Sequence, residues 1–133
     1  MAYLKEFSGR ILLEITSEGY VKRFAGPYEY KIEGLQVKEY SGRVIYKIDG
    51  DYIKDFYGRI VLIYQNGYIK HFAGQYEYKV DMNYIKKWSG EIVYKIDGIL
   101  SRPQLMGLLA ILFAWFIRSA DFALFICINH YLY

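Results

Sequence analysis

Apolar and aromatic side chains recur along residues 3–98 in short alternating runs, separated by pairs that contain glycine. Alternation with a period of two is typical of a β-strand with one buried face, and glycine-containing pairs are typical of turns. After Gly98 the alternation ends, and the run from Leu105 to Ile117 is apolar on every side. The pattern predicts a mainly β domain at 1–99, with about twelve short strands, and a hydrophobic α-helical tail at 100–133.

The strand pattern repeats. A lysine followed four residues later by a glycine recurs six times, at spacings of 16 residues with one step of 17. A longer match aligns residues 3–50 with residues 52–98, most clearly in FAGPYEYKI, from Phe24, and FAGQYEYKV, from Phe72. We therefore predict six units in two duplicated halves, with a pseudo-two-fold in the fold. The recurrent lysines are Lys5, Lys22, Lys38, Lys54, Lys70 and Lys86.

Two folds could use such a repeat, and the turn residues distinguish them. Asp49-Gly50, Asn66-Gly67 and Asp97-Gly98 suit two-residue hairpin turns, because glycine, asparagine and aspartate accept a positive φ. A parallel solenoid would instead stack the six lysines about 4.8 Å apart, and like charges so placed repel each other. Tandem antiparallel β-hairpins are therefore favoured over a solenoid.

The motifs YIKDFYGRI, from Tyr52, and YKIDG, from Tyr94, resemble the repeats of bacterial β-flower proteins, which are built from hairpin petals around a common axis. The resemblance extends from residue 3 to about residue 105 and includes the exit GILSRPQL, from Gly98. It implies a ligand-sensing or conflict-associated module, and it brings no catalytic residues to transfer. It also implies that equivalent side chains of the units gather around one axis.

The recurrent lysine has two interpretations. If alternation continues unbroken through the turns, Lys54 shares a face with Tyr46 and Ile48, and six lysines converge on the axis as a site for a small anionic ligand. One bulge per unit would instead place Ile53 inside and Lys54 outside, where lysine deters edge pairing. The structural interpretation is favoured, and the anion site stays open. The aromatic residues that would line such a site are Tyr30, Tyr46, Phe56, Phe72, Tyr78 and Tyr94.

The C-terminal segment begins as a helix, with Ser101 as N-cap, Pro103 in the first turn and Gln104 at the reciprocal capping position. The apolar sequence at 105–133 is long enough to enter a membrane. The equal alternative is burial inside the protein or in a homo-oligomer, because so apolar a segment should not stay exposed on a monomer. Residues expected to serve either role are Leu105, Leu109, Leu112, Phe113, Phe116, Arg118 and Asp121.

The charge and the residue composition disfavour several classes of function. With 17 basic and 14 acidic residues the net charge is only +3, which does not favour a nucleic-acid partner. His71 and His130 form no Cys/His cluster with metal spacing, and Cys127 has no partner for an internal disulfide. His71 occupies a position of the repeat that otherwise holds charged residues, so we expect it to be solvated. The N-terminus lacks the pattern of a signal peptide. We expect no metal, no cofactor and no catalytic residue, and a cytoplasmic β domain.

The sequence thus predicts a non-enzymatic β-repeat binding or sensor module. We expect it to be coupled to the inner membrane or to its own oligomer through the hydrophobic tail. Two alternatives stay open, namely a self-assembling structural scaffold and a glycan-binding surface protein.

Overall fold

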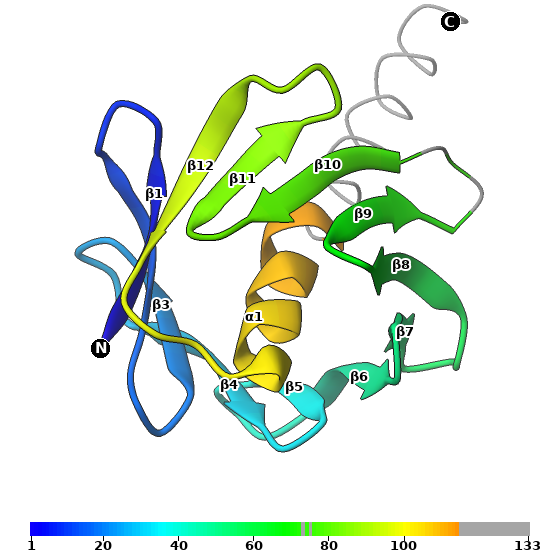
Figure 1. Cartoon of the computed structure of the whole chain (residues 1–133). Coiled ribbons are helices and arrows are strands. Elements are labelled where there is room, and N and C mark those ends of the chain that lie inside the picture. Colours follow the sequence, from blue (N-terminus) through cyan, green and yellow to red (C-terminus); the bar gives the residue numbers. More distant parts are fainter. Residues whose placement is uncertain (73, 75, 115–133) are drawn as a thin grey trace, which may run out of the picture.

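The computed structural model describes residues 1–72, 74 and 76–114, and it is mainly β (Figure 1). Twelve strands follow one another, each antiparallel to its neighbours in the chain, and β1 pairs with β12 to close a barrel. Helix α1 (Arg102–Leu109) and the π-helical turn η1 (Ala110–Ala114) follow. The strands are β1 (Ala2–Glu6), β2 (Ile11–Ile15), β3 (Tyr20–Arg23), β4 (Tyr28–Glu33), β5 (Gln36–Glu39), β6 (Val44–Asp49), β7 (Tyr52–Asp55), β8 (Ile60–Gln65), β9 (Tyr68–His71), β10 (Tyr76–Asp81), β11 (Tyr84–Lys87) and β12 (Ile92–Asp97). The predicted antiparallel hairpins are confirmed, and the solenoid is wrong. Two of the predicted turns are corrected, because the β6–β7 turn is Gly50-Asp51 rather than Asp49-Gly50, and Asp97-Gly98 leads into α1 rather than into a hairpin.

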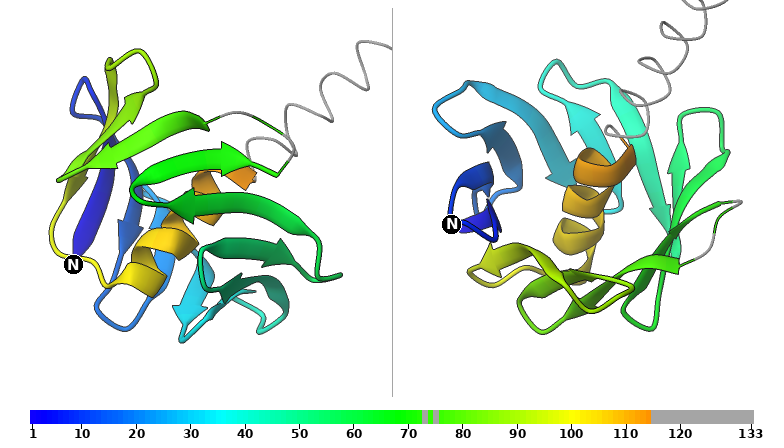
Figure 2. Two further views of the ribbon diagram at one scale, coloured as in Figure 1. Left: turned by 45° about the vertical axis from the view of Figure 1, so that its right-hand side comes forward. Right: turned by 90° about the horizontal axis from the view of Figure 1, so that it is seen from above.

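Helix α1 runs inside the barrel, and the strands encircle it in the view from above (Figure 2). Met106 and Leu109 are 0% and 1% exposed, and both belong to the single hydrophobic core. A barrel of this many strands has an interior too wide for its own side chains to fill, so the helix supplies the missing core. Leu105, Leu112 and Phe113 also pack against or within this core, whereas Phe116, Arg118 and Asp121 lie outside the described residues.

The turn between β6 and β7 fixes the face of Lys54. Asp49 pairs with Tyr52 and Ile48 pairs with Ile53, so the two residues between them form the turn. Paired residues on neighbouring strands point to the same face of the sheet. Ile53 therefore faces inward with Ile48 and is 0% exposed, and Lys54 faces outward. Unbroken alternation through the turn, which placed Lys54 inside, is wrong because a two-residue turn shifts the parity by one.

A bulge recurs next to the lysine. Ile53 pairs with Leu62, but Lys54 pairs with Ile60, which leaves Val61 as the extra residue of β8. The same register shift occurs beside the other five lysines or their partners. A bulge beside the lysine is thus present, but the outward face of Lys54 is set by the turn, and not by the bulge as the outward interpretation assumes. Bulges bend and twist strands locally, so each hairpin bends at the same level of the barrel.

The two ends of the barrel differ. At one end, here called the closed end, short turns such as Asn66-Gly67 join consecutive hairpins, and both turn residues there have the positive φ that was predicted for this pair. At the other end, here called the mouth, longer loops join the two strands of each hairpin, as between β7 and β8. Each long strand therefore has one inward side chain near the closed end and another near the mouth. In β6 these are Ile48 near the closed end and Tyr46 near the mouth.

Several contacts attach α1 to the closed end. The predicted capping box is confirmed, because Ser101 Oγ accepts from the Gln104 amide at 3.3 Å and Gln104 Oε1 accepts from the Ser101 amide at 3.1 Å. Arg102 pairs with Asp51 at 2.9 Å. A Cβ atom at Gly107 would lie 2.6 Å from the Ile32 Cδ1 atom, so only glycine lets the helix approach the wall this closely.

Candidate functional site at the mouth of the barrel

The last described residues of the chain lie at the mouth of the barrel. Helix α1 starts at the closed end, and η1 continues it toward the mouth. The ring of Phe113 lies 4.6 Å from that of Tyr78 and 6.2 Å from that of Tyr94, centroid to centroid. These two tyrosines are inward residues on the mouth side of β10 and β12. Phe113, near the end of the described chain, therefore lies among inward residues at this end of the barrel.

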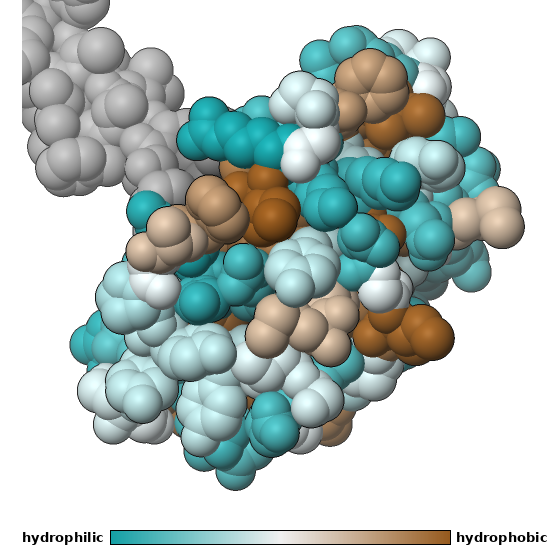
Figure 3. Space-filling model, turned by 90° about the vertical axis from the view of Figure 1, so that its left-hand side faces the viewer, coloured by the Kyte–Doolittle hydropathy of each residue, from teal (hydrophilic) through white to brown (hydrophobic). Residues whose placement is uncertain are grey.

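The six recurrent lysines do not line the mouth. They lie on the outer wall, where Lys54 pairs with Asp49 at 2.7 Å and Lys5 pairs with Asp97 at 2.9 Å across the seam between β1 and β12. Figure 3 shows one side of this wall, on which hydrophilic and weakly polar side chains surround separate hydrophobic ones. Lysines converging on the axis are thus wrong, and binding of an anion by the outer lysines stays a prediction. The other close contacts join Lys22 to Glu14, Lys38 to Glu33, Lys86 to Asp81 and the Lys70 ammonium to the Tyr76 ring.

The predicted aromatic lining separates into two groups. Tyr46 is buried at 5% exposure, and Tyr30, Tyr78 and Tyr94 pack partly buried against the core. Burial raises the pKa of Tyr78 and Tyr94, in both cases as the main cause. Phe56 and Phe72 lie on the mouth loops instead and are 64% and 62% exposed.

A cavity of about 910 Å³ lies at the mouth among β6, β7, β8 and β9. Its walls combine apolar side chains from the strands with polar and aromatic side chains from the loops. A smaller cavity of about 260 Å³ lies where η1 meets β2, β3, β4 and β12. The large cavity is lined by Arg43, Val44, Ile45, Tyr46, Asp55, Phe56, Tyr57, Gly58, Arg59, Ile60, Val61, His71 and Phe72.

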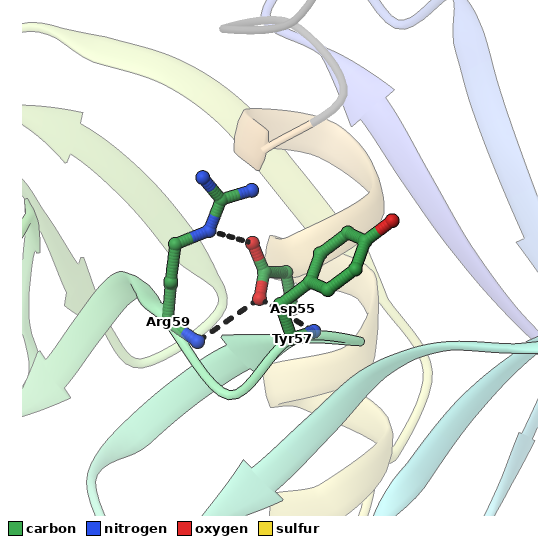
Figure 4. Close-up of polar contacts among 3 residues, drawn as sticks. All are labelled: Asp55, Tyr57 and Arg59. Carbon is green, nitrogen blue, oxygen red and sulfur yellow. Dashed lines mark hydrogen bonds and ion pairs between the residues drawn. The ribbon is translucent and has the colours of Figure 1, made fainter.

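The loop between β7 and β8 is held by the carboxylate of Asp55 (Figure 4). This group accepts hydrogen bonds from the amides of Tyr57 and Arg59 and from Arg59 Nε, each at 2.9 Å. Partial burial alone raises the pKa of Asp55, but the hydrogen bonds and charge of Arg59 outweigh it and lower the pKa below its usual value. The Arg59 guanidinium also lies over the Tyr57 ring at 5.5 Å, which fixes its position beside the cavity.

His71 contributes an unsatisfied nitrogen to the cavity wall. Its Nδ1 atom lies 3.2 Å from Glu77 Oε1, and its buried Nε2 atom has no hydrogen-bond partner among the described residues. The column of the repeat that holds His71 contains charged residues, which indicated solvent exposure. That expectation is wrong, because His71 pairs with the inward Leu62 and its side chain is 29% exposed.

The loop between β7 and β8 exposes Tyr57 at 79%. In addition, each of the six mouth loops carries an exposed aromatic residue two positions after the recurrent lysine. Their exposures range from 61% to 73%. Sequence reasoning included two of them only as lining residues, although the constant offset from the lysine would have identified the whole set. We call them the rim aromatics: Phe7, Phe24, Tyr40, Phe56, Phe72 and Trp88.

No family model, no curated protein and no solved structure matches the chain. Among the described residues no group of histidine, cysteine and acidic side chains could hold a metal ion. None of the helices in that same part of the chain has the length and apolar character needed to cross a membrane.

Proposed function

We propose that the protein is a non-enzymatic binding module whose mouth takes up a small, partly apolar anionic ligand. The barrel is coupled to a membrane or to its own oligomer through the C-terminal segment. The observation that carries the proposal is the cavity of about 910 Å³ with the unpartnered Nε2 atom of His71 in its wall. Ligand sites of small molecules commonly have volumes of about 300–1,000 Å³.

The lining supports this class of ligand. Val44, Ile60 and Val61 offer apolar surface. The guanidinium of Arg59 uses Nε for Asp55, and its terminal nitrogens are donors suited to a phosphate or carboxylate. His71 Nε2 accepts a hydrogen bond when the ring is neutral and donates one when it is protonated. A ligand whose polar head group lies between Arg59 and His71 would place its apolar part against the strands.

The repeat pattern supports a sensing role. Six units in two duplicated halves would give two related sectors of the mouth, and the two cavities differ in volume and lining. One sector can therefore be specialised for a ligand while the other packs against η1. The resemblance to β-flower repeats supports a place in bacterial conflict or defence.

Titration of the full chain with dodecyl phosphate tests the proposal, followed by calorimetry and by thermal unfolding. A ligand that binds only the folded state raises the unfolding temperature with concentration. The variant His71→Phe should weaken binding by about tenfold, equivalent to roughly 1.4 kcal/mol. Lys47→Ala, on the exposed outer wall, is the matched control and should bind as the wild type does.

Two results would overturn the proposal. One is an unfolding temperature that none of dodecyl phosphate, dodecanoate, inorganic phosphate and nucleotides changes. The other is equal affinity of His71→Phe and the wild type for a ligand that does bind, because the site would then lie elsewhere.

A further inference from the structure

We propose that the rim aromatics form a docking surface that lies in the interfacial layer of a lipid bilayer, around the point where the chain enters it. This inference rests on the membrane attachment included in the proposed function, and it does not depend on the ligand in the cavity. It adds a second contact between the barrel and the bilayer, made by the folded domain itself.

The six rim aromatics are distributed around the whole mouth. Every mouth loop exposes a rim aromatic, and the loop between β7 and β8 also exposes Tyr57, so together they surround the opening rather than form a patch on one side. The closed end also exposes large apolar side chains, including Leu35, Met82 and Ile99. These three residues are aliphatic, and the aromatic residues exposed at this end, Tyr52 and Tyr84, are only 42% and 37% exposed. Phenylalanine, tyrosine and tryptophan together on one rim are the side chains that favour a membrane interface.

The sequence that follows the described helix is mostly apolar. Of the 19 residues from Trp115 to Tyr133, 14 are apolar or aromatic, and the described chain before them ends at the mouth, where Phe113 lies against Tyr78. An occupant that receives this segment and reaches all six loops at once must extend across the barrel axis on every side. A bilayer has that planar form, with an apolar interior beneath a polar surface.

Exposed cationic residues lie close to the rim aromatics in the sequence. Arg10, Arg43 and Arg59 are exposed three residues after a rim aromatic, and Arg23 and Lys87 are exposed immediately before one. Cations at this level suit the phosphates of lipid headgroups, and they favour anionic lipid. Several of these cations have carboxylate partners, for example Arg43 with Glu39 at 2.6 Å, so the charge is a secondary contribution to the apolar contact.

Two of the rim aromatics are positioned by neighbours on the outer wall. Trp88 lies 5.5 Å from the Tyr68 ring and Tyr40 lies 6.1 Å from the Tyr20 ring. Both remain more than 60% exposed, at 64% and 63%. Because these contacts hold the rings near the wall, Trp88 is a fixed reporter of what covers the rim.

The test uses the full chain with Trp115→Phe, which leaves Trp88 as the only tryptophan of the two. Vesicles of phosphatidylcholine with a minority of phosphatidylglycerol are mixed with the protein, and flotation measures attachment. Trp88 emission is then recorded with lipids brominated either near the headgroup end or near the terminal methyl of the acyl chain. The expected result is flotation, a blue shift, and stronger quenching by the bromines near the headgroup.

A matched pair of variants assigns the effect to the rim. Phe7, Phe24, Phe56 and Phe72 are replaced by serine together in one variant, and Leu35, Met82 and Ile99 are replaced by serine in the other. All seven side chains are more than half exposed, so both variants should unfold cooperatively like the parent. Quenching of Trp88 by the headgroup-proximal bromines should be lost in the rim variant and retained in the closed-end variant.

Each alternative outcome is decisive. If the protein does not float, the membrane attachment fails and the docking surface fails with it. If it floats while Trp88 is neither shifted nor quenched, the attachment stands and the docking surface is overturned. If the emission is already blue-shifted without vesicles and the protein sediments as a dimer, the rim covers a second copy, which also overturns the inference.

Discussion

The closed end and the mouth are built from the same repeated hairpins, yet they differ in what their residues do. At the closed end the turns are short, the helix is capped, and Gly107 lets α1 pack directly on Ile32. At the mouth the loops are longer, the lining includes polar groups such as Asp55 and His71, and large aromatic side chains face solvent. The same repeat therefore concentrates stability at one end and accessible surface at the other.

Within one repeat, the strand register decides which residues pack in the core and which lie at the mouth. The two-residue turn fixes which face is inside, and the bulge beside each lysine bends the hairpin before it reaches the mouth. Inward-facing residues between the turn and the bulge thus belong to the core, outward-facing ones such as Lys54 belong to the outer wall, and residues beyond the bulge belong to the mouth. Substitutions on the two sides of this boundary should have effects of different size and kind.

The largest expected effect comes from Leu109→Ala, which removes a side chain that is 1% exposed inside the barrel. Loss of buried contacts and the remaining cavity should lower the free energy of unfolding by about 2–5 kcal/mol. The counterpart at the mouth, Phe56→Ala, should change it by no more than about 0.5 kcal/mol, because the ring is exposed. Urea unfolding followed by circular dichroism measures both, and equal losses would show that the two ends do not differ as described.

Next in size is Gly107→Ala. Its new methyl group would meet the side chain of Ile32 at 2.6–3.1 Å, and such overpacking typically costs about 1–3 kcal/mol. Ile32→Val, which deletes the Cδ1 atom that would lie nearest, should recover part of the loss when combined with Gly107→Ala. A double-mutant cycle in urea measures this coupling, and strictly additive losses would contradict the close contact.

A smaller effect is expected from Ser101→Ala, which removes the side-chain oxygen that caps α1. Substitution of a serine N-cap usually lowers stability by about 0.5–2 kcal/mol. Ser41→Ala, in a mouth loop and exposed, is the control and should be nearly neutral. A loss in the control as large as that at Ser101 would mean that the mouth loops contribute more to stability than their exposure indicates.

The smallest effect concerns pH. The pKa of Asp55 lies below its usual value, so the folded state binds this proton less tightly than the unfolded state does. Its contribution to stability is therefore complete above the unfolded pKa of about 3.9 and is lost as the pH falls through the folded pKa. Asp55→Asn should reduce the slope of stability against pH below about pH 4, and an unchanged slope would mean that Arg59 does not stabilise the carboxylate.

Much of the fold follows from local sequence signals. The alternation of residues such as Tyr46 and Ile48, the Asn66-Gly67 turn and the Ser101 capping box are short-range features, and each has the structure that its chemistry predicts. The face of Lys54 could not be derived in the same way, because it depends on which two residues form the turn. A shift of one position in that assignment inverts the whole strand.

The candidate site was less predictable than the fold. Barrel closure and burial of α1 depend on contacts between residues far apart in the chain, such as Lys5 with Asp97, and no local pattern specifies them. His71 looked like one more solvated position because its column varies among charged residues. Only its pairing with Leu62 shows that it faces inward. The rim aromatics had a clear signal, but their meaning required knowing that all six loops lie at one end.

The position of α1 in the chain has a consequence for biosynthesis. The helix that fills the barrel is made after the last strand, and β1 must wait for β12 before the sheet can close. A nascent chain that has reached Gly98 therefore carries twelve strands with apolar inner faces and nothing to cover them. Productive folding must wait until α1 has also been made and is free to pack, so shielding of the emerging hairpins by a chaperone would matter more for this protein than for one that builds its core progressively.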